Sequence, residues 1–290
     1  MSSQALCFQN IAVAAHPQVN EAFLEAEKIS RHLQEHGRRS WYGMLYNDEL
    51  HSRVTNGEFD LLIALGGDGT MLRAGHLCGP SNLPILGINM GRFGFLTEVQ
   101  RDQWPKVMPR LLGGDCWLEK RMMLTAERWR GEQLLGNWEV LNEVVLSRGQ
   151  VLRPIHVSAY VDDRLLTTYV ADGLIAATPT GSTAYALAAG GPILPPELRN
   201  ILLVPVAPHL SIDRAIVLAE GTTVSMTAEG DHPPVLSLDG QLPIEITRED
   251  RVDVRASHHT VVFVRFQEPG YFYHNLTRHM NQNPSTGNHR

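Results

Sequence analysis

The sequence predicts an α/β N-terminal domain with a parallel sheet, followed by a mostly β C-terminal domain. Up to about residue 100, short apolar runs alternate with helical patterns, as in parallel strands joined by crossover helices. After that, the chain consists mainly of short β-branched segments, separated by turn signals such as Asp162-Asp163 and Glu249-Asp250. A length of 290 residues suits one large domain or two of ordinary size.

We expect the first domain to extend over residues 1–100. Its expected strands are the apolar runs 10–15, 41–45, 61–65 and 84–88. Its expected helices run from Asn20 to Gly37 and from Thr70 to Leu77. The segment 46–58 is polar, and we expect neither a helix nor a strand there. Ligands of such sheets bind at the carboxyl ends of the strands, so the loops after 61–65 and 84–88 are candidate sites.

The second domain is expected at residues 101–264. It begins with an amphipathic helix, 102–112, and continues with short strands at 122–129, 138–146, 156–161, 174–178, 201–206, 224–228, 235–238, 244–247, 252–256 and 261–266. A further helix is expected at 184–189, where strong helix formers precede two glycines. The polar tail, 281–290, is expected to be disordered.

Composition argues against several classes of protein. The formal net charge of −6, without a basic stripe, argues against nucleic-acid binding. No apolar run approaches the roughly 20 residues of a membrane helix, and the N-terminus lacks the basic region of a secretory signal. Cys7, Cys78 and Cys116 are too far apart for a disulfide framework or a zinc ribbon. We therefore expect a cytoplasmic protein.

The histidines do not indicate a metal site. His32 and His36 are four residues apart, and His258 and His259 are adjacent, but neither pair has a third ligand at a repeated spacing. We therefore expect no metal ligands among the side chains of the protein.

The most informative part of the first domain is Gly66-Gly67-Asp68-Gly69-Thr70, directly after the apolar run 61–65. The glycines lose much conformational entropy when they become ordered, which a close approach of the main chain to a ligand would explain. The one charged side chain among them is Asp68. We interpret this loop as a phosphate-handling loop. The alternative is a tight Gly-Asp-Gly turn without chemistry.

A second glycine-rich stretch, residues 87–96, follows the next expected strand and includes Asn89, Arg92, Phe93 and Phe95. An aromatic ring beside flexible main chain can stack on a nucleobase. A phenylalanine packed under a loop explains the pattern equally well, and the spacing does not distinguish the two.

Asn142-Glu143 lies inside the apolar segment 138–146. An amide and a carboxylate are costly to bury unless they are paired. The edge of an adenine and the hydroxyls of a ribose both need such groups, so this pair is a candidate for binding adenosine. The alternative is a structural pair that is satisfied by hydrogen bonds.

The stretch from Asp172 to Tyr185 contains four hydroxyl side chains, namely Thr178, Thr180, Ser182 and Thr183. Ser182 or Thr183 is expected to cap the helix that follows. Free N–H groups at a helix start favour an anion such as a pyrophosphate. The alternative is a Pro-Gly turn before a capped helix, which leaves the other hydroxyls and Tyr185 unexplained.

Asp239-Gly240-Gln241 is by itself an ordinary hairpin signal. Three common motifs are absent from the sequence. No G-x-G-x-x-G follows an expected strand, no G-x-x-x-x-G-K-[ST] occurs, and Gly181-Ser182 lacks the closing glycine of a G-x-S-x-G elbow. These absences argue against a dinucleotide dehydrogenase, a P-loop kinase and a serine hydrolase.

Together, these stretches resemble the signature blocks of the NAD kinase family, in the family's order. The matching blocks are residues 66–70, 87–96, 141–145, 172–192, 208–211 and 239–241. The resemblance spans about residues 13–273, which is nearly the whole chain. A Gly-Gly-Asp-Gly loop alone is similar to loops of lipid kinases and phosphofructokinases, so its combination with Thr183-Ala184-Tyr185 carries the resemblance.

The resemblance implies the NAD kinase and diacylglycerol kinase-like fold, with a segment of about 265–280 that returns to the first domain. It implies transfer of a phosphoryl group from ATP, or polyphosphate in some members, to the 2′-hydroxyl of the adenosine ribose of NAD, which gives NADP. The phosphates of the donor call for a divalent cation such as Mg²⁺. A homodimer or homotetramer is expected, without nucleic-acid or membrane partners.

The resemblance also implies roles for single residues. Asp68 would accept the proton of the hydroxyl, Gly66, Gly67 and Gly69 would let the loop approach phosphates, and Phe95 would lie against the adenine. Asn142, Glu143, Thr183, Ala184 and Tyr185 would line the adenosine pocket. Asp172 would lie near the nicotinamide part and Gln241 at the edge. The resemblance adds Thr70, Asn89, Arg153 and Ala188 to the binding residues.

Val170 and Ala188 depart from some family members, which carry a basic residue and a serine at these positions. Each change removes a polar group that could contact the dinucleotide or a neighbouring subunit. A lipid kinase of the diacylglycerol or sphingosine type is the alternative enzyme, on the same glycine-rich loop. A non-catalytic dinucleotide-binding sensor is the alternative from another class, and the presence of Asp68 argues against it.

Overall fold

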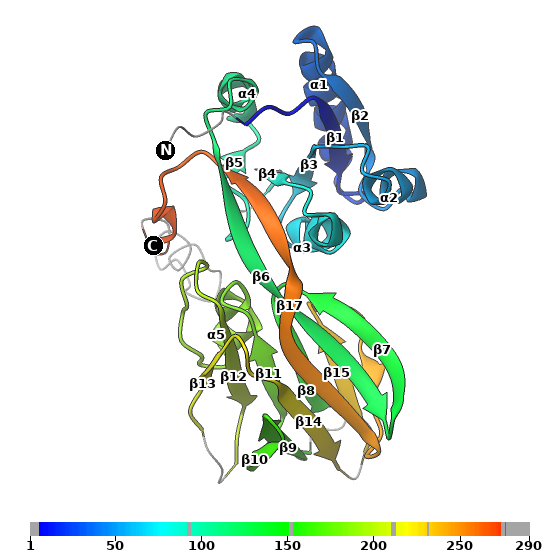
Figure 1. Cartoon of the computed structure of the whole chain (residues 1–290), viewed down its shortest axis with the longest axis vertical. Helices are drawn as coiled ribbons and strands as arrows, with labels where there is room; N and C mark the ends of the chain where they lie inside the picture. Colours follow the sequence, from blue (N-terminus) through cyan, green and yellow to red (C-terminus); the bar gives the residue numbers. More distant parts are fainter. Residues whose placement is uncertain are drawn as a thin grey trace, which may run out of the picture. The chain divides into compact units, whose positions relative to one another are not determined.

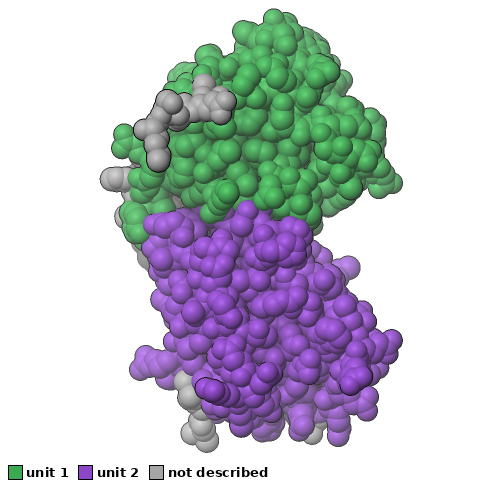
Figure 2. Space-filling view, viewed as in Figure 1, with its two compact units in different colours: residues 1–120, 261–290 green, residues 121–260 purple. Residues whose placement is uncertain are grey.

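The computed structural model describes residues 6–91, 94–150, 153–209, 213–230, 232–273 and 276. The chain forms two compact units, which Figure 2 distinguishes by colour. Unit 1 contains residues 1–120 and 261–290, and unit 2 contains residues 121–260.

These boundaries differ from the expected ones at 100 and 264. Helix α4 (Trp104–Leu112) buries Trp104, Met108 and Leu111 in the core of unit 1, which moves the first boundary to residue 120. The chain returns to unit 1 at Val261, inside a strand, because the residues after it belong to the sheet and core of this unit. The tail 281–290 lies outside the described residues.

Unit 1 is an α/β unit with a parallel sheet in the order β2-β1-β3-β4 (Figure 1). Its strands are β1 (Asn10–Ala15), β2 (Arg39–Met44), β3 (Leu61–Gly66), β4 (Ile85–Asn89) and β5 (Val99–Gln100). β5 and the end of β17 (Asp250–Arg265) also pair with β4. Its helices are α1 (Asn20–Glu35), α2 (Asp48–Thr55), α3 (Asp68–Cys78) and α4, with a 3₁₀ turn, η1 (Gly79–Ser81).

Helices pack on both faces of this sheet because its strands are apolar on both faces. Alternate residues of β1, β3 and β4 share one core with α1 and α4. Gly87 of β4 points to the other face, since its neighbours Leu86 and Ile88 belong to that core. A Cβ atom at Gly87 would lie 2.7 Å from Met71 Sδ, so α3 packs against the opposite face.

Two local expectations for unit 1 are wrong. The polar segment 46–58 contains helix α2, in which the Asn47 side chain accepts a hydrogen bond from the Glu49 N–H at 2.7 Å. Only Leu50 and Val54 of this helix are buried. Two apolar positions are too few to show helical periodicity in the sequence. Helix α3 begins at Asp68 rather than at Thr70, so the aspartate lies in the first turn of a helix.

Unit 2 contains antiparallel strands in two groups (Figure 1). The first is a sheet in the order β13-β12-β11-β8-β15-β16, made of β8 (Glu143–Arg148), β11 (Gly173–Ala177), β12 (Asn200–Val206), β13 (Ile216–Ala219), β15 (Pro234–Leu238) and β16 (Ile244–Glu245). In the second group, β10-β9-β14-β17 are neighbours and β6 pairs with β17 and β7. Its other strands are β6 (Trp117–Arg130), β7 (Gln133–Val140), β9 (Ile155–Val161), β10 (Arg164–Ala171) and β14 (Val224–Glu229).

The two groups of strands enclose one apolar core. Leu146 of β8 and Leu174 of β11 meet Val157 of β9 and Met226 of β14 in this core. The opposite faces of β8 and β11 are also buried, in a second core with Ala186 of the short helix α5 (Tyr185–Ala188). These two strands, which carry the predicted polar stretches, are therefore fixed from both sides.

Three expectations for unit 2 are wrong in detail. Segment 138–146 forms two strands, because the chain turns at Leu141 and Asn142 between β7 and β8. The expected helix 184–189 has only the four residues of α5 and follows a 3₁₀ turn, η2 (Gly181–Thr183). Segments 252–256 and 261–266 belong to the single long strand β17.

A buried arginine connects the end of β17 to the second glycine-rich stretch of unit 1. Arg265 is 1 % exposed, and its Nε donates to Glu119 Oε2 at 2.8 Å while its Nη1 donates to the Leu96 carbonyl at 3.0 Å. The Tyr271 hydroxyl donates to the same Glu119 carboxylate. The guanidinium also lies over the rings of Phe263 and Tyr271. Removal of one partner would leave a buried charge uncompensated.

Replacement of Arg265 by methionine should lower the free energy of unfolding by about 3–5 kcal/mol, because Glu119 would lose its buried partner. Arg31→Met is the matched control, since the ion pair of Arg31 with Glu27 lies on the surface of α1 and should contribute about 0–1 kcal/mol. Denaturant unfolding of the full chain measures both variants. Equal losses in the two variants would contradict this role of Arg265.

Candidate active site

The glycine-rich sequence after β3 places Asp68 at the start of α3. A Cβ atom at Gly66 would overlap the buried side chain of Thr70, so packing requires a glycine there. Gly67 and Gly69 are exposed, and a Cβ atom at either position would meet no other atom within 4 Å. These two glycines leave the main chain at the N-terminus of α3 open to solvent. The end of a helix with free N–H groups favours anions.

The Asp68 carboxylate is held by the second glycine-rich stretch. Its Oδ2 accepts a hydrogen bond from the Phe95 N–H at 2.7 Å, and its Oδ1 accepts one from the Leu96 N–H at 3.1 Å. The main chain of Gly94 lies so close that a Cβ atom there would overlap the carboxylate. The position of Asp68 therefore depends on residues 94–96, a dependence that the sequence pattern does not reveal. Arg92 and Phe93 lie outside the described residues.

Asn89 and Arg73 complete the polar groups around this edge of the sheet. Asn89, at the end of β4, is 1 % exposed and pairs with Gly66 of β3. Its Oδ1 accepts a hydrogen bond from the Gly91 N–H at 2.9 Å, which shapes the start of the second loop. Arg73 of α3 is not among the predicted residues. Its guanidinium lies 4.9 Å from the centre of the Tyr46 ring, and its spacing from Asp68 places it on a different side of α3, so the sequence gives no signal for it.

In unit 2, the main chain around Asn142-Glu143 is held from two sides. The Asp239 carboxylate accepts hydrogen bonds from the N–H groups of Leu141 and Asn142 at 2.7 Å each, and from that of Glu143 at 3.0 Å. On the other side, Thr178 Oγ1 donates to the Leu141 carbonyl at 2.6 Å, and the Thr178 N–H donates to the Asn142 carbonyl at 2.8 Å. Asn142 thus lies in a rigid turn, and Glu143 is the first residue of β8.

The Glu143 carboxyl group is buried, with 7 % of the residue exposed. Burial raises the pKa of Glu143 to about 8, the negative charge of Asp239 adds to the increase, and a hydrogen bond from the Tyr185 N–H opposes it. Within the described parts of the chain, Glu143 Oε2 has no hydrogen-bond partner. A buried polar atom without a partner needs an explanation. The hydroxyl of a bound ligand would be a suitable partner for this oxygen.

The hydroxyl groups before Tyr185 stabilise a tight turn and do not cap a helix. Ser182 and Thr183 each donate to the carbonyl of the third residue before them, at 2.6 Å and 3.1 Å. Ala184 occupies the N-cap of α5, without a side-chain cap. The expected cap is therefore wrong, and a helix of four residues does not support the expected pyrophosphate site. The turn leaves Thr183 and Ala184 half-buried and Tyr185 44 % exposed.

The other predicted residues of unit 2 are Arg153, Asp172, Ala188 and Gln241. Asp172, between β10 and β11, forms an ion pair with Arg148, whose Nε lies 2.9 Å from Asp172 Oδ1. This partner is not evident from the sequence. Arg153, Ala188 and Gln241 are exposed.

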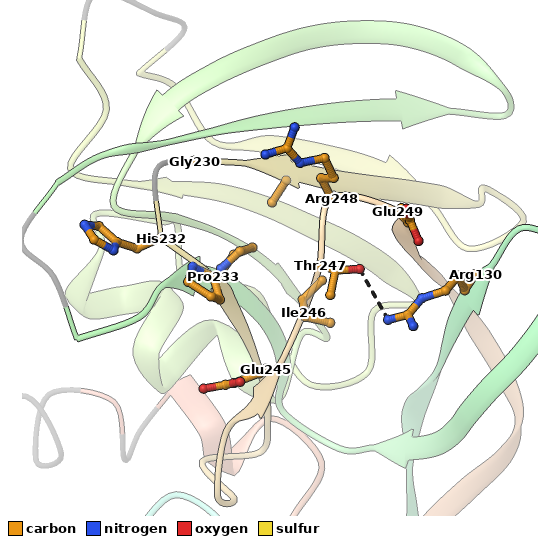
Figure 3. A pocket seen from close by; sticks show the side chains of 11 residues that line it. Arg130, Gly230, His232, Pro233, Glu245, Ile246, Thr247, Arg248 and Glu249 are labelled. Carbon is orange, nitrogen blue, oxygen red and sulfur yellow. Dashed lines mark hydrogen bonds between the residues drawn. The ribbon is translucent and has the colours of Figure 1, made fainter.

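A separate pocket of ≈ 460 Å³ in unit 2 contains none of the predicted site residues (Figure 3). Its rim carries charges of both signs, from Arg130, Glu245, Arg248 and Glu249. Arg130 Nη2 already donates to Thr247 Oγ1 at 3.3 Å. A rim with charges of both signs does not specifically attract the phosphates of a nucleotide.

In the described ranges, no group of three or more His, Cys, Asp and Glu side chains is arranged to hold a metal ion. Among the same residues, no helix combines the length and apolar character that a membrane crossing requires.

Solved structures of known kinases share this fold. Yeast NADH kinase in complex with NADH superposes with a TM-score of 0.81, at 22 % identity over 98 % of this chain and 90 % of that one. An NAD kinase from Archaeoglobus fulgidus in complex with ATP gives a TM-score of 0.77, at 24 % identity over 93 % of this chain and 98 % of that one. These likenesses confirm the predicted fold class.

Curated relatives and family models both indicate an NAD kinase. An NAD kinase of Chloroflexus aurantiacus is 38 % identical over 92 % of this chain and 97 % of its own length. One of Dehalococcoides mccartyi is 35 % identical over 93 % of this chain and 95 % of its own. The model of the ATP-NAD kinase N-terminal domain matches residues 3–116, and that of the ATP-NAD kinase C-terminal domain matches residues 141–266. The chain therefore belongs to the NAD kinase family.

Proposed function

We propose that the chain is an NAD kinase, which transfers the terminal phosphoryl group of ATP or polyphosphate to the 2′-hydroxyl of the adenosine ribose of NAD and forms NADP. The observation that carries the proposal is the Asp68 carboxylate, fixed by two main-chain N–H groups at the exposed start of α3. The names of the curated relatives support the same activity. NADH and ATP in the two similar structures support a dinucleotide acceptor and a nucleotide donor.

In this mechanism Asp68 orients the attacking hydroxyl and accepts its proton. The 2′-oxygen forms a bond to the terminal phosphorus of ATP, the bond from that phosphorus to its bridging oxygen breaks, and ADP leaves with the electron pair. A carboxylate is a weak base toward a ribose hydroxyl, so the proton moves late, as positive charge develops on the attacking oxygen. The Phe95 and Leu96 N–H groups fix the carboxylate before the reaction begins.

The main chain at Gly67 and Gly69 is open to solvent and would approach the phosphates of the donor. Thr70 supports Gly66 and hence the loop. We propose that the donor enters as a complex with Mg²⁺, because this cation keeps several waters and binds readily to substrate phosphates. The cation is then part of the substrate.

We assign the binding of NAD to unit 2. The fixed Asn142 amide and the Glu143 carboxyl suit the base and the ribose of an adenosine. The remaining assignments rest on the family resemblance, and they are Thr183, Ala184, Tyr185 and Ala188 for the adenosine, Asp172 for the nicotinamide part, and Arg153 and Gln241 for the edge of the site. In unit 1, the same resemblance assigns Asn89 and Phe95 to the dinucleotide.

Two further properties belong to the proposal. A homodimer or homotetramer follows from the family resemblance. A cytoplasmic location is supported by the free thiols of Cys7, Cys78 and Cys116, which form no disulfide with each other.

A single assay tests the proposed reaction. The purified chain receives ATP and Mg²⁺, with NAD, NADH or diacylglycerol offered in separate reactions. Formation of NADP supports the proposal. A phosphorylated lipid would instead indicate a lipid kinase, and binding of NAD without a product would indicate a sensor; the curated relatives favour neither.

Replacement of Asp68 by asparagine should keep the fold and the binding of NAD while it lowers the rate of NADP formation by at least about 100-fold. The amide cannot take the proton of the hydroxyl, and its NH₂ group would face the N–H of Phe95 or Leu96, which weakens its positioning as well. Steady-state rates, together with calorimetric binding of NAD, measure the two effects. A turnover close to that of the unchanged chain would show that Asp68 is not the proton acceptor.

Replacement of Gly94 by alanine should displace the Asp68 carboxylate and lower kcat by about 100-fold, since a small misplacement of a catalytic group has an effect of this size. Gly91→Ala in the same loop is the matched control, because a Cβ atom there meets no atom within 4 Å. The control should keep its activity, and both variants should melt as single folded proteins. Comparable rates for the two variants would mean that the contact with Gly94 does not position Asp68.

A further inference from the structure

The hairpin turn after β15 contains a carboxylate that the turn itself does not need. Asp239 and Gly240 have φ angles of +48° and +67°, and the Gln241 N–H donates to the Leu238 carbonyl at 2.9 Å. Positive φ at both central residues is typical of a type I′ turn, for which Asn-Gly is as suitable as Asp-Gly. The aspartate at this position therefore calls for another explanation.

Both oxygens of this carboxylate bind main-chain N–H groups of the segment that connects β7 to β8. Oδ2 accepts from Leu141, and Oδ1 accepts from Asn142 and Glu143. Strand pairing brings the segments together, because Leu238 at the end of β15 lies opposite Val144 at the start of β8. An asparagine has one acceptor oxygen and would turn its NH₂ group toward one of these donors. The three bonds thus require a carboxylate.

The same turn brings a negative charge to Glu143. Across the β8–β11 pair, the residue opposite Glu143 is Ala177, which is apolar. The Tyr185 N–H is a polar neighbour, and it favours the ionised carboxyl. Among the residues that the structure describes, Asp239 is the charged group that acts on Glu143.

We propose that Asp239 is a positioning residue of the NAD site, which fixes the main chain of residues 141–143 by three hydrogen bonds and thereby sets the position of the Glu143 carboxyl. It acts through Asn142 and Glu143 and does not itself touch the substrate. The assignment of NAD as the ligand rests on the proposed function, whereas the effect of Asp239 on Glu143 does not.

The first experiment measures the titration of Glu143 without any substrate. The folded chain retains a proton on Glu143 up to about pH 8, whereas an ordinary glutamate in the unfolded chain releases it near pH 4.3. The folded chain therefore loses stability between these two values as the pH rises. Glu143→Gln removes this loss. The melting temperature of the unchanged chain relative to that of Glu143→Gln should fall with rising pH and become constant above about pH 8.

The same comparison is then made between Asp239→Asn and the double variant Asp239→Asn, Glu143→Gln. Without the charge of Asp239, the pKa of Glu143 should be lower, so the difference in melting temperature should become constant at a lower pH. Asp162→Asn is the matched control. Asp162 also lies in a turn with positive φ, +47°, and its Oδ1 accepts a hydrogen bond from the Thr223 N–H at 2.9 Å. In this control background the pH dependence should not move.

The second experiment measures the positioning of the main chain with NAD as the probe. Asp239→Asn should raise KM for NAD about tenfold with kcat nearly unchanged, because the bound dinucleotide would then have to order the main chain of residues 141–143 itself. Asp239→Gly keeps the turn but removes all three bonds, so its KM should rise further. KM for ATP should stay constant in both variants. Asp162→Asn should match the unchanged chain.

Each part of the proposal can fail separately. An unchanged pH dependence in Asp239→Asn would overturn the effect of Asp239 on Glu143. Folded Asp239→Asn and Asp239→Gly variants with the original KM for NAD would overturn the positioning role. If the unchanged chain neither binds nor phosphorylates NAD, the proposed function fails, and the melting experiment still decides the link between Asp239 and Glu143.

Discussion

Hydrogen bonds from main-chain N–H groups to buried or half-buried carboxylates are the interaction on which the polar sites of both units depend. In unit 1, the N–H groups of Phe95 and Leu96 hold Asp68. In unit 2 the carboxylate is the supporting group, because Asp239 holds the main-chain N–H groups of a neighbouring turn. Such bonds are strengthened by the charge of the acceptor, and each carboxylate binds more than one N–H group. The geometry therefore needs little further ordering of side chains.

The parts of this fold that depend on burial can be predicted from the sequence. Residues 61–65 are fully buried in β3, and the continuous apolar run reports that directly. Helix α2 buries only two residues, so its pattern resembles that of a loop. Residues 184–189 are good helix formers, but the hydroxyls of Ser182 and Thr183 bind nearby carbonyls and hold a turn in place of a longer helix. Local hydrogen bonds of this kind produce no repeating pattern in the sequence, unlike the burial of apolar residues.

The same distinction applies to the site. Asp68 and Glu143 are visible as candidates because a carboxylate among glycines or inside an apolar segment is unusual. Asp239 is not visible as a candidate, because Asp-Gly is a common turn sequence and the partner of Asp239, Leu141, lies 98 positions away. Arg148, the partner of Asp172, is hidden in the same way. The residues that carry chemistry can thus be recognised one by one, while those that position them become apparent only when the strands are paired.

The bond between Arg265 and the Leu96 carbonyl has a consequence for how the chain is made. These residues are 169 positions apart, and unit 1 is assembled from two separate parts of the sequence. Unit 2 is a continuous insertion that includes the first part of β17, so it can fold on the ribosome before the end of this strand emerges. The loop that holds Asp68 must wait for that strand. A growing chain that has not yet reached Arg265 therefore carries the glycine-rich loop without this support.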